Sequence, residues 1–408
     1  MTRTLAAERL PSPYWRLWWA AAIDNIGDGV VATAMPLLAV TITRDPILIG
    51  VVSAATYLPW LLLSIPIGAL VDRGDRVGLM WRSQVMQAVI VGGLAILAAC
   101  RQVDMAVLAV TGLALGTCEV VFGNASQAVL PDIVAGPQLH RANGHQTTIA
   151  NLGQLFVGPP LGGLLFAVAI ALPFGLDAVS FAGSAALVAT LPRRPRKEAA
   201  PSPIRTAMSE GLRWLAGHRL LRALALLLCA NTFCFQLGNV TLVLLATQTL
   251  HLNAHGYGLL LSGAAIGSVL GGLVNARIVR TIGVLAALLV ALSANVAIFL
   301  AIGFSPDAIV LGMLLALNGF ATTMWSIVSV TLRQQVVPAP LLGRVNSVYR
   351  MLGWGLMPLG ALAGGIIAHE FGLRAGYPIA GALRGIALAV ALPVLIPAVR
   401  AVGPVRPR

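Results

Sequence analysis

Twelve long apolar runs dominate this 408-residue sequence, and short polar stretches separate them. Each run is long enough to form an α-helix across a hydrocarbon core of about 30 Å, which needs about 20 residues. The runs are continuous, whereas membrane-spanning strands alternate between apolar and polar residues. We therefore predict twelve membrane-spanning helices, at residues 17–42, 46–70, 79–100, 105–129, 146–169, 172–191, 220–247, 256–276, 282–303, 307–330, 345–369 and 376–399.

The composition excludes a water-soluble protein. Only 10% of the residues are charged, against about 25% in soluble domains, so the chain cannot cover a water-facing surface. A formal net charge of +13 is typical of proteins that bind nucleic acid, but here the basic residues lie between apolar runs rather than on one soluble face. We expect the lipid bilayer to surround the chain, and we expect no nucleic-acid partner.

The basic residues also predict the orientation in the membrane. If both termini lie on one side, only Arg44, Arg101 and Arg374 fall in outer connections, and Arg384 falls inside the last run. The other 23 of the 27 Lys and Arg residues then lie on the inner side. Because basic residues concentrate in cytoplasmic connections, we predict a multi-pass protein of the inner or plasma membrane with both termini in the cytoplasm.

The longest connection, residues 192–217, divides the runs into two groups of six. Four basic residues lie between positions 193 and 197, among several prolines. Basic segments of this kind lie near anionic headgroups of the cytoplasmic leaflet. We interpret the connection as a solvated cytoplasmic linker between an N-terminal six-helix half, residues 1–191, and a C-terminal six-helix half, residues 218–408.

A repeat with an offset of 203 residues relates the two halves. Residues 68–72 match residues 271–275, and residues 137–143 match residues 340–346. Two separate connections that share one offset indicate that the halves are copies of one six-helix unit. Parallel repeats of this kind enclose a cavity near the middle of the bilayer in transporters. The predicted fold is therefore an all-α integral membrane protein with two pseudo-symmetric halves.

Two motifs resemble signatures of the major facilitator superfamily. Residues 68–76, Gly-Ala-Leu-Val-Asp-Arg-Gly-Asp-Arg, resemble its signature between spans two and three, although Asp75 stands where the pattern has glycine. Residues 158–163, Gly-Pro-Pro-Leu-Gly-Gly, resemble its antiporter signature in span five, with Gln154 and His145 in place of two upstream glycines. Over nearly its whole length the chain resembles the drug:proton antiporter-like efflux group, which includes macrolide and siderophore exporters.

The resemblance implies a cytoplasmic gate formed by Asp72, Arg73 and Arg76, which lock the inner helix ends together when the cavity faces outward. An arginine–carboxylate pair near helix ends can form such a latch. Asn275 and Arg277 form a weakened second copy of this gate. The alternative is an ordinary solvated turn that carries positive charge because it is cytoplasmic.

The antiporter motif consists of Gly158, Pro159, Gly162 and Gly163. Proline removes an amide donor, and glycines let a neighbouring helix approach closely. We expect a kinked, tightly packed helix that seals the cavity against proton leakage, with a lipid-facing kink as the alternative.

Acidic residues inside the apolar runs are the candidates for proton coupling. A charge deep in a span costs at least about 2.5 kcal/mol and usually faces a cavity or relays protons. Asp24 and Asp28 are four residues apart on one helical face and can share a single proton near neutral pH, and Glu119 lies past the middle of span four. Hydrogen bonding that only holds helices together is the alternative for the aspartates. We interpret Asp177 as a cap at the start of span six.

The superfamily's arginine signature is missing from span four, so proton exchange should depend on Asp24, Asp28 and Glu119. The C-terminal half offers instead weak candidates for the substrate cavity. They are Asn231, Gln236, Asn239, Trp325 and Arg384, with core packing as the alternative for the tryptophan.

These features predict a secondary active transporter that exports a hydrophobic or amphipathic small molecule by proton antiport and alternating access. The sequence has no glycine-rich loop followed by lysine, so we expect no direct use of ATP. His251 and His255 lack a third ligand, so we expect no metal. We predict no catalytic residues, no cofactor beyond the proton gradient, and a monomer. A lipid or siderophore exporter on the same fold, or a non-transporting receptor or assembly platform, are the alternatives.

Overall fold

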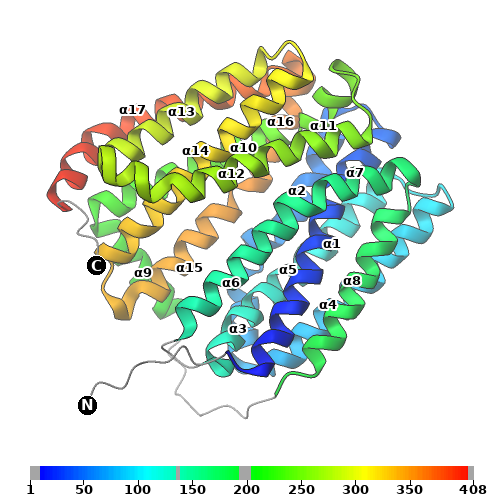
Figure 1. Ribbon diagram of the computed structural model, residues 1–408, viewed down its shortest axis with the longest axis horizontal. Coiled ribbons are helices and arrows are strands. Elements are labelled where there is room, and N and C mark those ends of the chain that lie inside the picture. Colours follow the sequence, from blue (N-terminus) through cyan, green and yellow to red (C-terminus); the bar gives the residue numbers. More distant parts are fainter. Residues whose placement is uncertain (1–9, 135–137, 193–203, 403–408) are drawn as a thin grey trace. The chain divides into compact units, whose positions relative to one another are not determined.

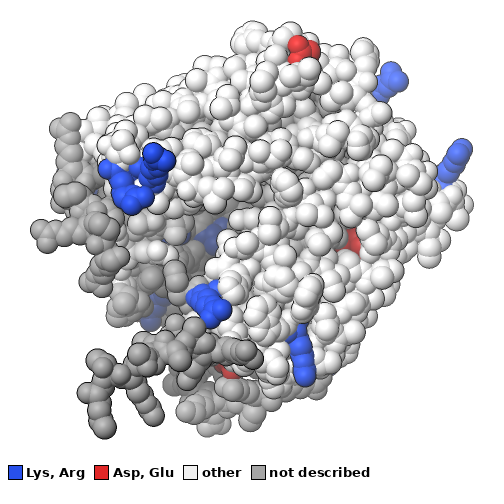
Figure 2. All heavy atoms as spheres, viewed as in Figure 1, with Lys and Arg blue, Asp and Glu red and all other residues white. Residues whose placement is uncertain are grey.

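The computed structural model describes residues 10–134, 138–192 and 204–402, and its regular structure in those ranges is helical (Figure 1). Every predicted span contains helix. Eleven helical segments of the described residues are long and apolar enough to cross a membrane, and Pro46–Leu62 is a shorter apolar helix. Charged side chains are few on the face drawn in Figure 2. The predicted all-α fold with twelve spans is confirmed.

The first six spans consist of α1 (Ser12–Ile42), α2 (Pro46–Leu62) with α3 (Ser64–Arg73), α4 (Arg76–Ala99), α5 (Met105–Ile133), α6 (Leu139–Asn151) with the π-helix η2 (Leu152–Val157) and α7 (Gly158–Val168), and α8 (Leu172–Ala189). The last six consist of α10 (Arg219–Asn239) with α11 (Leu242–Leu244) and the π-helix η3 (Leu245–Thr249), α12 (Ala254–Ile282), α13 (Val284–Gly303), α14 (Ala308–Val336), α15 (Ala339–Gly355) with α16 (Met357–Phe371), and α17 (Gly376–Val402).

Prolines account for the interruptions in spans two and five. The ring of Pro66 cannot be placed against the carbonyl of Leu62 in a regular helix, and α2 ends at Leu62. Pro159 and Pro160 lack the amide donors of two consecutive helical hydrogen bonds. The wide turns of η2 lie directly before them, as expected where the regular ladder is broken.

One helix was not predicted. Residues Ile204–Gly217 form α9, which packs against α15. Arg344 of α15 forms an ion pair with Glu210, and a methyl group at Gly211 would lie 3.1 Å from the carbonyl carbon of Arg344. The segment predicted as a solvated cytoplasmic linker therefore contains a helix, its place in the cytoplasm stays a prediction, and residues 193–203 lie outside the described residues.

The chain forms two compact units. The first contains the described residues of Met1–Ala34, Leu63–Gln102 and Thr117–Ala199, and the second contains those of Met35–Leu62, Val103–Gly116 and Ala200–Arg408. In the first unit α4 packs along α8, and in the second α12 packs along α14 and α13 along α17.

Small residues explain why α2 belongs to the second unit. A methyl group at Gly50 would lie 2.8 Å from the carbonyl oxygen of Ala361, and one at Gly365 would lie 2.6 Å from that of Pro46. The backbones of α2 and α16 therefore touch, as they do at membrane helix contacts built from glycine.

Candidate functional site

Four acidic side chains from three helices meet in the first unit. Asp24 and Asp28 lie on α1, Glu119 on α5 and Asp177 on α8. The side chains of Asp24 and Asp177 are buried, with 5% and 1% of their residue surfaces exposed. The other three carboxylates interact electrostatically with Asp28. We call these four residues the acid cluster.

A glutamine on α4 holds one member of the acid cluster. Gln84 is fully buried, and its Nε2 donates to Oδ1 of Asp24 at 2.9 Å. Its Oε1 accepts no hydrogen bond from the described residues. Gln84 is not among the predicted site residues, although an amide inside the predicted span 79–100 is a detectable signal.

Asp177 does not cap its helix, so that interpretation is wrong. The helix α8 begins at Leu172, with Pro173 in its first turn, which places Asp177 in the second turn. Ser180 Oγ donates to Oδ1 of Asp177 at 2.9 Å. A methyl group at Gly27 would collide with both side chains, so this glycine makes room on α1 for the Asp177 carboxyl.

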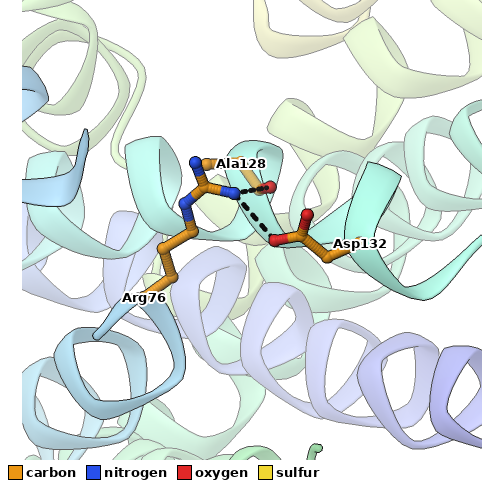
Figure 3. A network of polar contacts seen from close by, with 3 residues as sticks. All are labelled: Arg76, Ala128 and Asp132. Atoms are coloured by element: carbon orange, nitrogen blue, oxygen red, sulfur yellow. Dashed lines mark hydrogen bonds and ion pairs between the residues drawn. The ribbon is translucent and has the colours of Figure 1, made fainter. Parts of the chain in front are cut away.

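The predicted gate motif lies between α3 and α4. Asp72 and Arg73 are in the last turn of α3, and their side chains lie outside the described part of the structure. Arg76 Nη1 donates to Oδ2 of Asp132 at 2.7 Å and to the carbonyl oxygen of Ala128 at 2.9 Å (Figure 3). This contact ties the first turn of α4 to the last turn of α5. Sequence spacing gave no sign of Asp132 as the partner.

The second copy of the motif differs in local structure. Asn275 and Arg277 lie inside α12, which runs to Ile282, so the connection predicted after residue 276 is helical. Gly283 alone separates α12 from α13 and has a φ of 84°, a conformation that favours glycine. Asn275 Nδ2 donates to the carbonyl oxygen of Met324 on α14 at 3.3 Å, whereas Arg277 is exposed.

The antiporter motif packs on α1. Gly158, Pro159, Gly162 and Gly163 are all buried. A methyl group at Gly158 would lie 2.5 Å from Cα of Gly29, which follows Asp28 in the chain. The motif therefore brings the backbone of span five against the helix that carries both aspartates of the acid cluster.

A buried arginine organises polar groups in the second unit. Arg384 of α17 is 5% exposed, and its guanidinium lies 3.6 Å from the ring centroid of Phe299. Its Nη2 donates to the carbonyl oxygen of Asn231 at 3.0 Å, and its Nη1 lies 3.5 Å from Oδ1 of Asn295. Its Nε has no hydrogen-bond partner among the described residues.

Asn295 connects this arginine to α14. Its Oδ1 accepts from Nδ2 of Asn318 at 2.9 Å and from Oγ1 of Thr322 at 3.0 Å. We call Asn231, Asn295, Asn318, Thr322 and Arg384 the arginine cluster. At the repeat offset of 203 residues, Asp28 corresponds to Asn231 and Glu119 to Thr322. The acid cluster and the arginine cluster therefore share two equivalent positions.

The remaining cavity candidates have other surroundings. Gln236 is buried, and its Nε2 donates to Oγ of Ser53 on α2 at 2.6 Å. Trp325 is 5% exposed within the hydrophobic core of the second unit, and Asn239 is half-buried. Their contact with substrate stays a prediction.

Twelve spans in two repeated halves, with buried charged clusters, define a membrane transporter. The chain belongs to the major facilitator superfamily family described as "Transmembrane secretion effector", which matches residues 10–405. The resemblance seen in the sequence is therefore confirmed.

Relatives and solved structures agree with this family. The chain is 28% identical to "Multidrug efflux pump Tap" of Mycolicibacterium fortuitum, over 96% of this chain and 95% of that protein. It is 22% identical to "Macrolide efflux protein A" of Streptococcus pyogenes, over 94% and 95%. In fold it is similar to the nucleoside transporter NupG, with a TM-score of 0.73, 15% identity, and coverage of 95% of this chain and 99% of that one. It is also similar to a bacterial homologue of the iron transporter ferroportin, with a TM-score of 0.73, 16% identity, and coverage of 96% and 100%.

Proposed function

We propose that this transporter exports a hydrophobic or amphipathic small molecule from the cell in exchange for protons. The family is one of transporters, and relatives named for multidrug and macrolide efflux align along nearly the whole chain. The acid cluster is the observation that carries the proton part of the proposal. Family membership favours transport over the alternative of a receptor or assembly platform.

Protons act at the acid cluster. Asp24 has a donor in Gln84 and Asp177 has one in Ser180, whereas no described residue donates a hydrogen bond to Asp28. The four carboxylates repel one another when ionised, so a proton bound at Asp28 relieves repulsion within the acid cluster. Gain or loss of that proton changes the net charge buried in the first unit, and so shifts the balance between inward- and outward-open states.

The end of α3 and the start of α4 act as the cytoplasmic gate. Asp72, Arg73 and Arg76 form its main part, and the ion pair of Arg76 with Asp132 couples α4 to α5. Asn275 and Arg277 form the weaker copy. Both termini are cytoplasmic in the cell membrane, the protein acts as a monomer, and no cofactor is needed because the proton gradient supplies the energy.

The arginine cluster shapes the substrate side. Among the described residues Arg384 contacts one side-chain amide oxygen, one backbone carbonyl, the Cys234 thiol and a ring, and no carboxylate neutralises it. A hydrogen-bond acceptor on an otherwise apolar molecule is the complement of such a group. The same uncompensated charge favours a carboxylate-bearing siderophore as the second candidate substrate.

Transport by purified protein tests the proposal. Full-length protein in liposomes should drive ethidium or erythromycin against its gradient when a pH difference is imposed, and should move protons in the opposite direction. Dissipation of the pH difference with a protonophore should stop uphill movement. Uphill transport that continues without any proton gradient would show that the coupling proposal is wrong.

A further inference from the structure

An apolar groove runs along the outer surface where α4 meets α8 in the first unit. It is a shallow, open groove of about 460 Å³, lined by Trp81, Val85 and Val89 of α4 and by Ala182, Ala186 and Ala189 of α8. Val89 is 65% exposed, so the groove opens away from the unit's interior. The small alanine side chains leave a channel between two helices that otherwise pack closely.

One polar atom in the groove wall has no partner. The indole Nε1 of Trp81 is buried, and no described residue accepts its hydrogen bond. A buried donor without an acceptor costs about 1–3 kcal/mol, so such groups are nearly always satisfied. Because Nε1 itself has no accessible surface, an acceptor oxygen on a molecule in the groove would satisfy it once the indole ring turns toward the groove.

Two arginines lie near the end of the groove that is formed by Trp81 and Ala189. The guanidinium of Arg82 lies 5.5 Å from the ring centroid of Trp81, and its side chain is exposed. Arg16 is also exposed, and its Nη1 donates to the carbonyl oxygen of Thr190 at 3.1 Å. Thr190 directly follows Ala189, the last residue that lines the groove. Two cations therefore lie where the apolar channel meets the helix ends.

We infer that this groove binds an anionic phospholipid of the cytoplasmic leaflet. One acyl chain lies along the alanines of α8, and the indole of Trp81, turned toward the groove, donates its N–H to an ester carbonyl of the lipid. Arg16 and Arg82 bind the phosphate, which arginine recognises with paired donors. The predicted topology places both arginines at the cytoplasmic surface, where anionic headgroups gather.

Native mass spectrometry of the full-length protein in detergent tests this inference. The probes are a phosphatidylglycerol and a phosphatidylethanolamine with identical palmitoyl and oleoyl chains. The wild type should retain one phosphatidylglycerol about thirtyfold more strongly than the phosphatidylethanolamine, since two basic residues contribute about 1 kcal/mol each. Equal retention of the two lipids would overturn the inference, because it indicates unselective lipid around the protein.

Variants locate the bound lipid. Ala186→Trp fills the groove and should remove the preferred phosphatidylglycerol. Val179→Trp is the matched control on the same helix, because Val179 is 69% exposed and does not line the groove. Trp81→Phe keeps the ring but loses the donor, and Arg82→Gln loses the charge. Each should weaken phosphatidylglycerol binding several-fold.

Three results would contradict the assignment. Undiminished phosphatidylglycerol binding in both Ala186→Trp and Trp81→Phe would place the lipid elsewhere. Displacement of the lipid by millimolar inorganic phosphate would indicate a site for the free anion alone. A protein dimer that disappears in Ala186→Trp would show that a second copy of the chain covers the groove.

Discussion

The acid cluster and the arginine cluster occupy equivalent positions of the repeat but carry opposite charge. Asp28 and Glu119 stand where the other half has Asn231 and Thr322. Among the described residues, the fully buried acids Asp24 and Asp177 lie in the first unit. The buried arginine, Arg384, lies in the second.

The difference in charge type separates two tasks. Carboxylates surrounded by like charge can gain and lose a proton as the surroundings change. Arginine keeps its proton under physiological conditions, and the other members of the arginine cluster are amides and a hydroxyl. We infer that the repeat has diverged so that the first unit exchanges protons while the second holds a fixed charge toward the substrate.

Among the single variants considered, Glu119→Gln should cause the largest loss of pH-driven efflux. The amide keeps the shape of the side chain but cannot carry an exchangeable proton, so pH-driven efflux from proteoliposomes should fall to the level without a gradient. Binding of a neutral substrate, measured on the same preparation, should be retained. Loss of both activities together would instead indicate that Glu119 maintains the fold.

Arg76→Gln should reduce transport several-fold, and Arg277→Gln should leave it near the wild-type rate. Arg76 has an ion-pair partner in Asp132, whereas Arg277 is exposed on a continuous helix. The two side chains are 32% and 44% exposed to water, so the pair itself contributes at most about 1 kcal/mol. Transport rates of Arg76→Gln, Asp132→Asn and the double variant test the coupling, since additive effects would argue against a shared contact.

Gly158→Ala should lower the free energy of unfolding by about 1–3 kcal/mol. Its methyl group would lie 2.5 Å from Cα of Gly29, so α7 would have to move away from the helix that carries Asp28. Gly183→Ala on α8 is the control, because a methyl group there would meet nothing within 4 Å. Thermal unfolding in detergent should show a loss for the first variant and none for the second. Equal stabilities of the two variants would show that α7 and α1 leave room for a methyl group at residue 158.

Arg384→Met should raise the free energy of unfolding by about 1 kcal/mol. The unfolding temperature should rise slightly as a result. A charge without a carboxylate partner is costly within a membrane span, and replacing buried charge with an apolar side chain is often stabilising. Asn295 Oδ1 would keep its donors Asn318 and Thr322. Substrate affinity should fall while proton-driven efflux persists at high substrate concentration. A large loss of stability would show that Arg384 holds the helices together.

The fold was largely predictable because lipid permits few solutions. Each apolar run had to form a helix to satisfy its own backbone, and the basic residues and the repeat then indicated the arrangement in two halves. The helix α9 escaped prediction because residues 204–217 lack a long apolar run. The extension of α12 beyond residue 276 escaped for a similar reason, since its last turns carry arginines.

The site was less predictable because it depends on contacts between helices. Residue type and depth in a span singled out Asp24, Asp28 and Glu119, but periodicity within one helix could not show that Gln84 or Ser180 lies beside an acid. Asp177 was misinterpreted as a helix cap because the cap interpretation puts the start of the helix too late. The helix begins at Leu172, beside Pro173, about one turn before Asp177. The partner of Arg76 is equally invisible to spacing, since Asp132 lies 56 residues away.

Efflux under an imposed pH gradient, compared between Asp28→Asn and Asn231→Asp, tests the division of tasks most directly. These two residues are equivalent in the repeat, so the pair of variants removes an acid from one unit and adds one to the other. We predict that Asp28→Asn loses gradient-driven efflux of ethidium or erythromycin, and that adding Asn231→Asp to it does not restore the loss. If Asp28→Asn, Asp24→Asn and Glu119→Gln each still pump with the gradient, the acids only hold helices together and the proton pathway lies elsewhere.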